Sequence, residues 1–414
     1  MTPAAGNRGF ALVIALTLLA LLVLIIVALS ALARVNSRIA AASMQQAQAR
    51  QNSLLALQVA LGELQRHAGP DGRNTGMAGV AGIAPQNTFR QWTGVWGGTI
   101  SPVWLVSGAD NSPVPSLPGA RVIMVGSHTV GSPTNSTDQE PVEVGLIEVP
   151  GPTPSGTLRT TGRLGYWVGD EGIKASAVIS DEELQFSGAT GVGVRPNFRR
   201  LIGSTFVPGS ASNGKLIALE QLKIDVGGFS LGPAFHSVTL SHHALTATAD
   251  GGSPRPGDYV VGAFNVNTTS ESAWRAFLEF PDSANSVFGL DGARTLSAAR
   301  QIRDRIAARG RPFESPSDLL ASGLIQQSFD HASPKVTTVT EGDFLAELRP
   351  ILAARSDTFR IRGYGDTLSL ADGTTVEASA YCEAIVQRIP EMASTGMGRR
   401  FLVTYFRWLG RDDI

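Results

Sequence analysis

The strongest pattern in the chain is an uncharged apolar run near its start. None of residues 9–33 is charged, and Arg8 and Arg34 flank the run. A helix over residues 10–33 would be about 36 Å long, which exceeds the ~30 Å hydrocarbon core of a bilayer. Most of its side chains are Leu, Ile, Val or Phe, whose insertion into lipid is favourable. We therefore expect a transmembrane helix at 10–33, with Arg8 on the cytoplasmic side.

The helical pattern continues beyond this run and becomes amphipathic over residues 34–68. No Pro or Gly occurs between positions 10 and 59, and residues 69–72 read Gly-Pro-Asp-Gly, which ends a helix. The apolar stripe of the second half consists of four leucines with 3-4-3 spacing: Leu54, Leu57, Leu61 and Leu64. We predict one helix of about sixty residues, half of it in lipid and half packed through the leucines on a soluble domain.

Three kinds of segment fit an apolar run in this place. A cleaved secretory signal would use Ala31-Leu32-Ala33 as its A-x-A site, but the run exceeds the usual apolar region of about 7–15 residues. A plain membrane anchor would stay uncut. In a prepilin-type signal the peptidase cuts before the run, which stays in the mature protein. Residues 7–12, Asn-Arg-Gly-Phe-Ala-Leu, resemble a prepilin peptidase site with the cut between Gly9 and Phe10, and favour this third interpretation.

The remainder of the chain alternates between strand-like and helical patterns. Residues 69–88 and the Pro/Gly/Ser/Thr-rich stretches 108–120 and 150–162 read as loops or connections, and 182–235 is weakly patterned. Short strands are predicted at 103–106, 121–125, 141–149, 163–168, 357–364, 380–388 and 401–409, with a hairpin turn at Asp372-Gly373.

Helical signals cluster between these strands. Thr268 and Glu271 form a capping-box pattern, 296–309 is a helix ended by Gly310, and Ser315 is an N-cap before Pro316. A fourth helical pattern covers 344–354.

These elements predict an α+β fold, in which an antiparallel sheet packs against the long N-terminal helix. The expected division of the chain is a leader (1–9), a transmembrane helix (10–33), its amphipathic continuation (34–68), a β-rich domain (69–264), a helical insertion (265–355) and C-terminal strands (356–414).

The composition of the chain mainly excludes certain kinds of binding site. The net charge is −1 and charged residues make up 17% of the chain, which gives no basic surface for nucleic acid. A pair of helices near 296–320 carries several arginines, interleaved with Asp304, and reads as a solvated face rather than a DNA-binding motif. The single cysteine, Cys382, rules out an intrachain disulfide and a cysteine-based zinc site, and its alternation with alanines indicates a buried thiol.

No pattern points to catalysis or to a cofactor. The adjacent acids Asp170 and Glu171 are read as a structural or solvated turn, with calcium binding as a weaker alternative because calcium needs about 6–8 oxygen ligands. His242-His243 would face opposite sides of a strand. The Gly-rich run 188–193 has the wrong order for a phosphate loop. Trp92, Trp96 and Trp104 read as core anchors, with a carbohydrate-binding surface as the alternative.

Several stretches resemble pilin-like proteins. Residues 165–172 (GYWVGDEG) and 262–268 (GAFNVNT) look like the D-E-G and N-x-N-T stretches of the large minor pseudopilin of type II secretion, and 311–320 resembles part of its helical insertion. Residues 49–71, 263–274 and 359–414 are similar to large pilin-like proteins of the Verrucomicrobia type. Together these stretches cover about a third of the chain.

The resemblance implies a non-catalytic subunit that assembles or primes a filament of the type IV pilus or type II secretion kind. Prepilin peptidase, other pilin-like subunits and the inner membrane would be its partners, with the C-terminal domain in the periplasm or outside the cell. Pilins usually carry Glu at the fifth mature position, where this chain has Ile14. A carboxylate is costly in lipid without a partner charge, so Ile14 favours a minor or tip subunit. The alternative function is an adhesin or binding module on a simple membrane anchor.

Overall fold

The computed structural model describes most of the chain. The described residues are 8–83, 88–98, 101–110, 112, 115–131, 140–152, 156–176, 219, 231–232, 234–240, 243–245, 259–261, 263–279, 290–394 and 396–414. Most of the weakly patterned stretch 182–235 lies outside them, as do the Gly-rich run 188–193 and His242.

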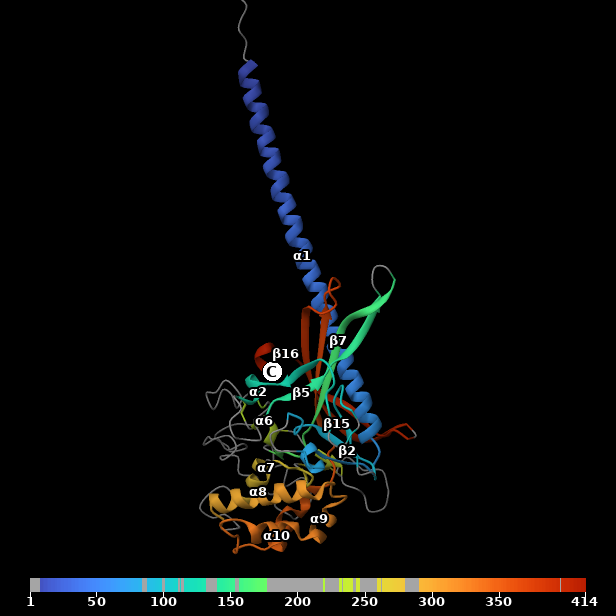
Figure 1. Ribbon diagram of the computed structural model, residues 1–414, viewed down its shortest axis with the longest axis vertical. Helices are drawn as coiled ribbons and strands as arrows, with labels where there is room; N and C mark the ends of the chain where they lie inside the picture. Colours follow the sequence, from blue (N-terminus) through green and yellow to red (C-terminus); the bar gives the residue numbers. More distant parts are fainter. Residues whose placement is uncertain are drawn as a thin grey trace, which may run out of the picture.

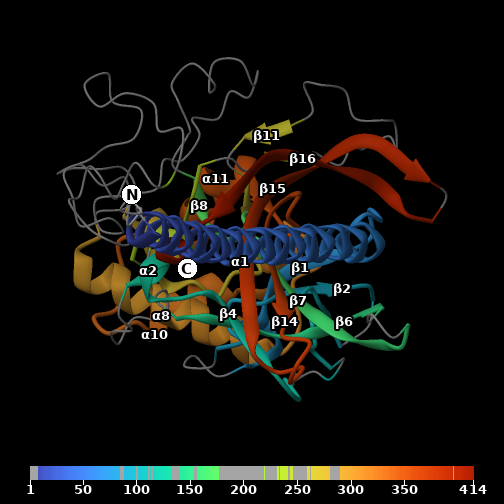
Figure 2. The same ribbon diagram turned by 90° about the horizontal axis from the view of Figure 1, so that it is seen from above.

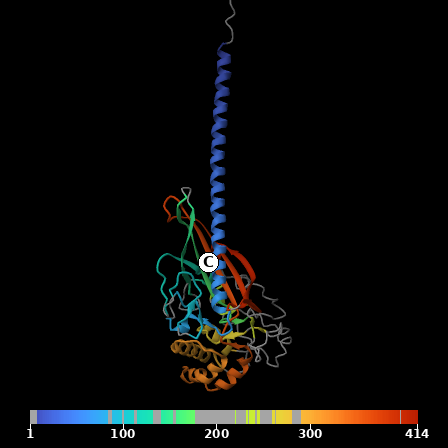
Figure 3. The same ribbon diagram turned by 90° about the vertical axis from the view of Figure 1, so that its right-hand side faces the viewer.

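One continuous helix, α1 (Arg8–Ala68), dominates the shape of the molecule (Figure 1). It has 61 residues, which confirms the single long helix predicted from the sequence. Its most apolar 18-residue window has a mean hydropathy of 3.4 and is 0% buried, so α1 is long and apolar enough to cross a membrane. The first half of α1 projects from the folded domain and the second half lies within it (Figure 3).

A five-stranded antiparallel sheet forms the centre of the domain. Its strands, in spatial order, are β16 (Gly398–Leu409), β15 (Val376–Ser394), β14 (Thr358–Leu368), β7 (Leu158–Asp170) and β6 (Ile147–Pro152). α1 packs across β14, β15 and β7, and Figure 2 looks down on this arrangement. The helices together with this sheet make an α+β fold.

The β6–β7 hairpin corrects two predictions. The predicted connection at 150–162 is strand over most of its described residues, and the predicted strand at 141–149 is two strands, β5 (Val142–Gly145) and β6, in different sheets. Pro150 and Pro152 suggested a loop, but β6 is an edge strand. An edge strand tolerates proline because its outer side needs no N–H donor.

Smaller sheets surround the central one. They comprise the three-stranded sheet β1 (Asn74–Met77), β2 (Thr93–Trp96) and β3 (Val103–Trp104), the antiparallel pairs β4 (Arg121–Val125) with β5 and β10 (His243–Leu245) with β11 (Tyr259–Val261), and the parallel pair β8 (Ala175–Ser176) with β9 (Val238–Thr239).

The predicted loop at 69–88 is wrong in part, because it contains β1 and the 3-10 helix η1 (Ala78–Ala81). Its glycines do not mark flexibility there: a Cβ at Gly79 would overlap the hydroxyl of Thr269. Gly79 leaves room for the Thr269 side chain, which packs directly against the backbone of this turn.

A helical layer lies at the end of the domain farthest from the start of α1 (Figures 1 and 3). Its helices are α7 (Glu271–Leu278), α8 (Gly292–Arg309), α9 (Pro316–Ser322), α10 (Leu324–His331) and α11 (Glu341–Leu348), followed by η3 (Arg349–Ile351). The short strands before and after them, β12 (Phe264–Asn265) and β13 (Leu352–Ala353), pair in parallel and bring the two ends of this segment together.

The helix-end signals mostly hold in this layer. Ser315 caps α9 and Gly310 ends α8 in the left-handed conformation, both as predicted. The N-cap of α7 is Ser270 rather than Thr268, because the Ser270 hydroxyl accepts from the amide of Ala273. Short helices α2 (Ser127–Val130), α6 (Ala234–Ser237) and η4 (Arg411–Asp413) complete the described elements.

Candidate functional site

The apolar half of α1 has no contacts that bury it within its own fold. Phe10 is 70% exposed and Ile14 is 45% exposed, and Gly9 lies in the first turn of the helix. A fold that leaves so many consecutive apolar side chains uncovered requires another apolar environment around them. Ile14 has no charge to satisfy there, which is compatible with lipid on every side.

The packed half of α1 meets the sheet along a seam of small side chains. The residues of this small-residue seam are Ala49, Ser53, Ala56 and Ala60 on α1 and Gly363 and Gly365 on β14. A Cβ at Gly365 would lie 2.5 Å from the carbonyl oxygen of Ala49, and the hydroxyl of Ser53 donates to the carbonyl of Gly363 at 3.0 Å. The helix backbone therefore rests almost directly on the strand backbone.

This seam differs from the predicted leucine stripe. Leu57 and Leu64 are buried and Leu61 is partly buried, but Leu54 is 37% exposed. Leucines fill the edges of the contact because its centre is too narrow for them. A sequence signal for the seam was present in the Ala/Ser positions at 3- and 4-residue spacing, which also recur on one face of a helix.

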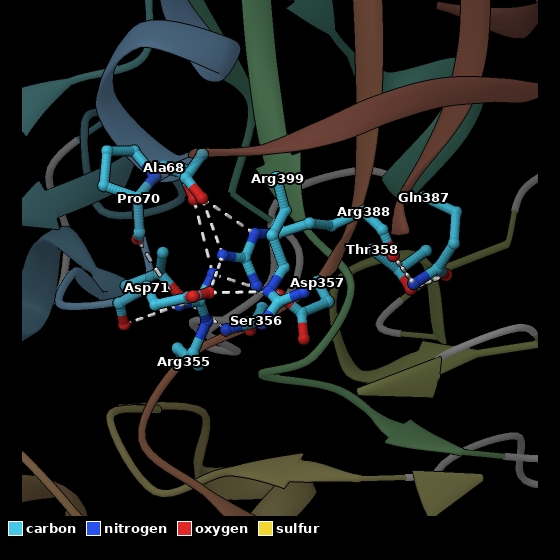
Figure 4. Close-up of polar contacts among 12 residues, drawn as sticks. Ala68, Pro70, Asp71, Arg355, Ser356, Asp357, Thr358, Gln387, Arg388 and Arg399 are labelled. Carbon is cyan, nitrogen blue, oxygen red and sulfur yellow. Dashed lines mark hydrogen bonds and ion pairs between the residues drawn. The ribbon is translucent and has the colours of Figure 1, made fainter. Parts of the chain in front are cut away.

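Two arginine side chains from the sheet region close the end of α1 (Figure 4). The guanidinium of Arg388 donates to the Gly69 carbonyl at 2.6 Å, and that of Arg355 donates to the Ala68 carbonyl at 3.3 Å. The last carbonyls of a helix lack partners within it and carry partial negative charge. The arginines therefore satisfy the helix end and fix it to the sheet.

Acidic side chains complete this helix-end cluster. Asp71 pairs with Arg388 and with Arg399, the latter at 2.8 Å, while buried Asp357 pairs with Arg388 at 3.3 Å and with Arg355 at 3.2 Å. Burial alone would raise the pKa of Asp71, but the hydrogen bonds from Arg388 and Arg399 outweigh it and hold the pKa below its usual value. The carboxylate is thus ionised throughout the neutral range.

A second charged cluster lies inside the domain and includes Glu171. One oxygen of Glu171 accepts from Lys174 at 2.7 Å and from Arg360 at 2.9 Å, and the other accepts from Thr239 at 2.6 Å. Burial opposes ionisation, but Lys174 and Arg360 lower the pKa of Glu171 to about 2. Arg360 also pairs with buried Glu383 at 2.8 Å. These residues form a buried ion-pair network across β7, β14 and β15.

The neighbouring Asp170 behaves differently. It is 2% exposed, and burial raises its pKa to about 6 although the amide of Gly172 donates to it at 2.8 Å. The pair Asp170-Glu171 does not fit a calcium site, because both Glu171 oxygens are committed to neighbouring donors. Within the described ranges, no group of three or more His, Cys, Asp or Glu side chains is placed to hold a metal ion.

Other candidate residues also lie in the interior. Trp92, Trp96 and Trp104 are 0–5% exposed, so they are core residues and not a carbohydrate surface. Cys382 is buried beside Ser53, with its sulfur 3.2 Å from the Ser53 hydroxyl oxygen. His236 is buried with a pKa lowered to about 3 by desolvation. The helix-end cluster could not be predicted from the sequence, because its members are far apart along the chain.

Comparison with known proteins does not assign the chain to a family. A scan against protein-family models finds no match, and a search of curated proteins also finds none.

Proposed function

We propose that this chain is a non-catalytic, pilin-like subunit, anchored in the inner membrane by a single span and exported as a prepilin. The observation that carries the proposal is the division of α1. One unbroken helix has a first half that is apolar and uncovered and a second half that lies against an antiparallel sheet. Residues 7–12 add a site at which prepilin peptidase would cut between Gly9 and Phe10.

The continuity of α1 favours this function over a cleaved secretory signal. A cut after Ala33 would break this continuous helix in its middle. The exposed half would be removed and the packed half would stay on the sheet. The remaining partners in the proposal are other pilin-like subunits, which α1 would meet in a filament. Ile14 in place of an acid favours a minor or tip position for this subunit.

Co-expression with a prepilin peptidase tests the proposal. Intact mass should show that the wild-type chain has lost residues 1–9. The matched variant Gly9→Leu should keep them, because a bulky side chain at position 9 blocks the cut. A known prepilin expressed alongside serves as the control for peptidase activity. An uncut wild-type chain in the presence of active enzyme would leave a plain anchor, and a cut after Ala33 would establish a secretory signal.

A further inference from the structure

Two hairpins project from the sheet toward the apolar half of α1 (Figures 1 and 3). One is β6–β7, and the other joins β14 to β15 through residues 369–375. The side chain of Gln45 on α1 donates to Glu377, two residues after the turn of the second hairpin, which fixes the level of that hairpin along the helix. Arg159 of the first hairpin donates to the carbonyl of Leu370 in the second at 3.4 Å, so the two ends are linked.

The ends of these hairpins expose apolar side chains. Leu158 is 74% exposed, more than any other large hydrophobic residue described outside α1, and Leu370 is 51% exposed. Isolated exposed leucines are common on proteins. Here, however, both belong to hairpins that project toward the apolar half of α1, and Arg159 links the two hairpin ends.

Basic side chains face the same region. Arg34 and Arg38 precede Gln45 by 11 and 7 residues, which at about 100° per residue places them within roughly 20° of its side of α1. Arg159 is exposed on the first hairpin, and α1 has no Asp or Glu before Glu63. Two acids also lie near the hairpin end: Asp372, which accepts from the amides of Thr374 and Thr375 at 2.9 Å each and stays anionic, and Glu377, which accepts from Gln45. The three arginines outnumber these two acids.

The dimensions of α1 place these groups close to a bilayer. From Ala33, where the apolar run ends, to Gln45 the helix rises about 18 Å. The hairpin advances beyond Glu377 by about four residues, which covers about 10–13 Å of that rise. The remaining gap of about 5–8 Å equals the depth of one headgroup layer.

We infer that Leu158, Leu370, Arg159, Arg34 and Arg38 form a docking surface for the headgroups of an anionic lipid bilayer. The inference rests on the proposed membrane span of α1. The arginines would bind lipid phosphates and the leucines would enter the interface, as for peripheral segments that combine basic and apolar residues. Docking would hold the domain against the membrane while the subunit is not assembled.

Site-specific fluorescence quenching of the full chain tests this inference. Leu158→Cys carries an environment-sensitive dye in vesicles of phosphatidylcholine with phosphatidylglycerol (3:1), or of phosphatidylcholine alone, each containing headgroup-nitroxide lipid. Cys382 is the only native cysteine and is buried, so wild type supplies the labelling background. Glu314→Cys, on the exposed far end before α9, is the matched control, and Leu22→Cys with acyl-chain nitroxides reports the span.

We expect the dye at position 158 to be quenched about threefold more than at 314 in the anionic vesicles, and less in the neutral ones. The double variant Arg34→Gln/Arg38→Gln should lower that quenching by about half, because it removes two of the three cations. Equal quenching at 158 and 314, with Leu22→Cys quenched from within the bilayer, would overturn docking and leave the anchor intact. Absence of quenching at Leu22→Cys would overturn the anchor itself. If protection of the dye at position 158 from water rises with the number of protein molecules per vesicle, the occupant of the surface is a neighbouring protein and not lipid, which would overturn the inference.

Discussion

At the scale of the residue, Asp170 has a distinctive pH signature. Its folded pKa of about 6 lies above the usual 3.8, so its protonated form stabilises the fold, and that contribution is lost as pH rises from about 4 through about 6. We predict that Asp170→Asn, which mimics the protonated acid, has little effect at pH 4. At pH 7 it should be more stable than wild type by up to about 3 kcal/mol.

Urea unfolding of the full chain in detergent, followed by tryptophan fluorescence at both pH values, measures this difference. Asp372→Asn is the opposite control, because turn hydrogen bonds lower the pKa of that exposed acid to about 2 and its substitution should destabilise the protein at pH 7. If the difference in unfolding free energy between Asp170→Asn and wild type does not change with pH, the pKa of Asp170 is not raised in the folded protein.

Gly365 tests the small-residue seam. An added Cβ would lie 2.5 Å from the Ala49 carbonyl and closer still to the Ser53 nitrogen, both backbone atoms that cannot rotate away. We predict that Gly365→Ala lowers the free energy of unfolding by about 3 kcal/mol through overpacking. Gly62→Ala, on α1 at a position where nothing lies within 4 Å of the new Cβ, is the control, and it should gain about 1 kcal/mol from helix propensity. If Gly365→Ala and Gly62→Ala change the free energy of unfolding by similar amounts, the helix and strand backbones in the small-residue seam are not in direct contact.

At the scale of the element, the end of α1 depends on the helix-end cluster. Arg388→Gln should cost about 3–5 kcal/mol, because it leaves buried Asp357 with one fewer cation and leaves the Gly69 carbonyl with the Arg399 amide in place of the guanidinium. Hydrogen exchange of the last turns of α1 should also accelerate. Arg400→Gln is the matched control in a surface pair 53% and 62% exposed, and should change stability by less than about 1 kcal/mol. If hydrogen exchange in the last turns of α1 is unchanged in Arg388→Gln, the helix-end cluster does not stabilise the end of α1.

Elements with local signals could be predicted from the sequence, and elements set by distant contacts could not. The Asp372-Gly373 turn, the Ser315 cap and the long helix α1 depend on residues next to one another, and the structure has all three. Gly79 and Pro150 suggested loops because their roles, close approach and an edge position, exist only in the folded sheet arrangement. The pairing of Asp71 with Arg388 joins positions 317 residues apart, which no local pattern reveals.

At the scale of the whole molecule, α1 connects two environments. Its apolar half is uncovered over a length that could cross a bilayer, and its second half is fixed to the sheet by the small-residue seam and the helix-end cluster. Movement of the helix along its own axis would therefore carry the domain with it. This coupling is what a subunit drawn from a membrane into a filament requires.

The N-terminus of the mature chain, isolated from the membranes of its native cells, tests the central claim most directly. Sequencing combined with intact mass should find Phe10 as the first residue, possessing the methylated amine that prepilin peptidase leaves. A chain that begins at Met1 or at Arg34 would contradict the account, since the first is an uncut anchor and the second a processed secretory protein.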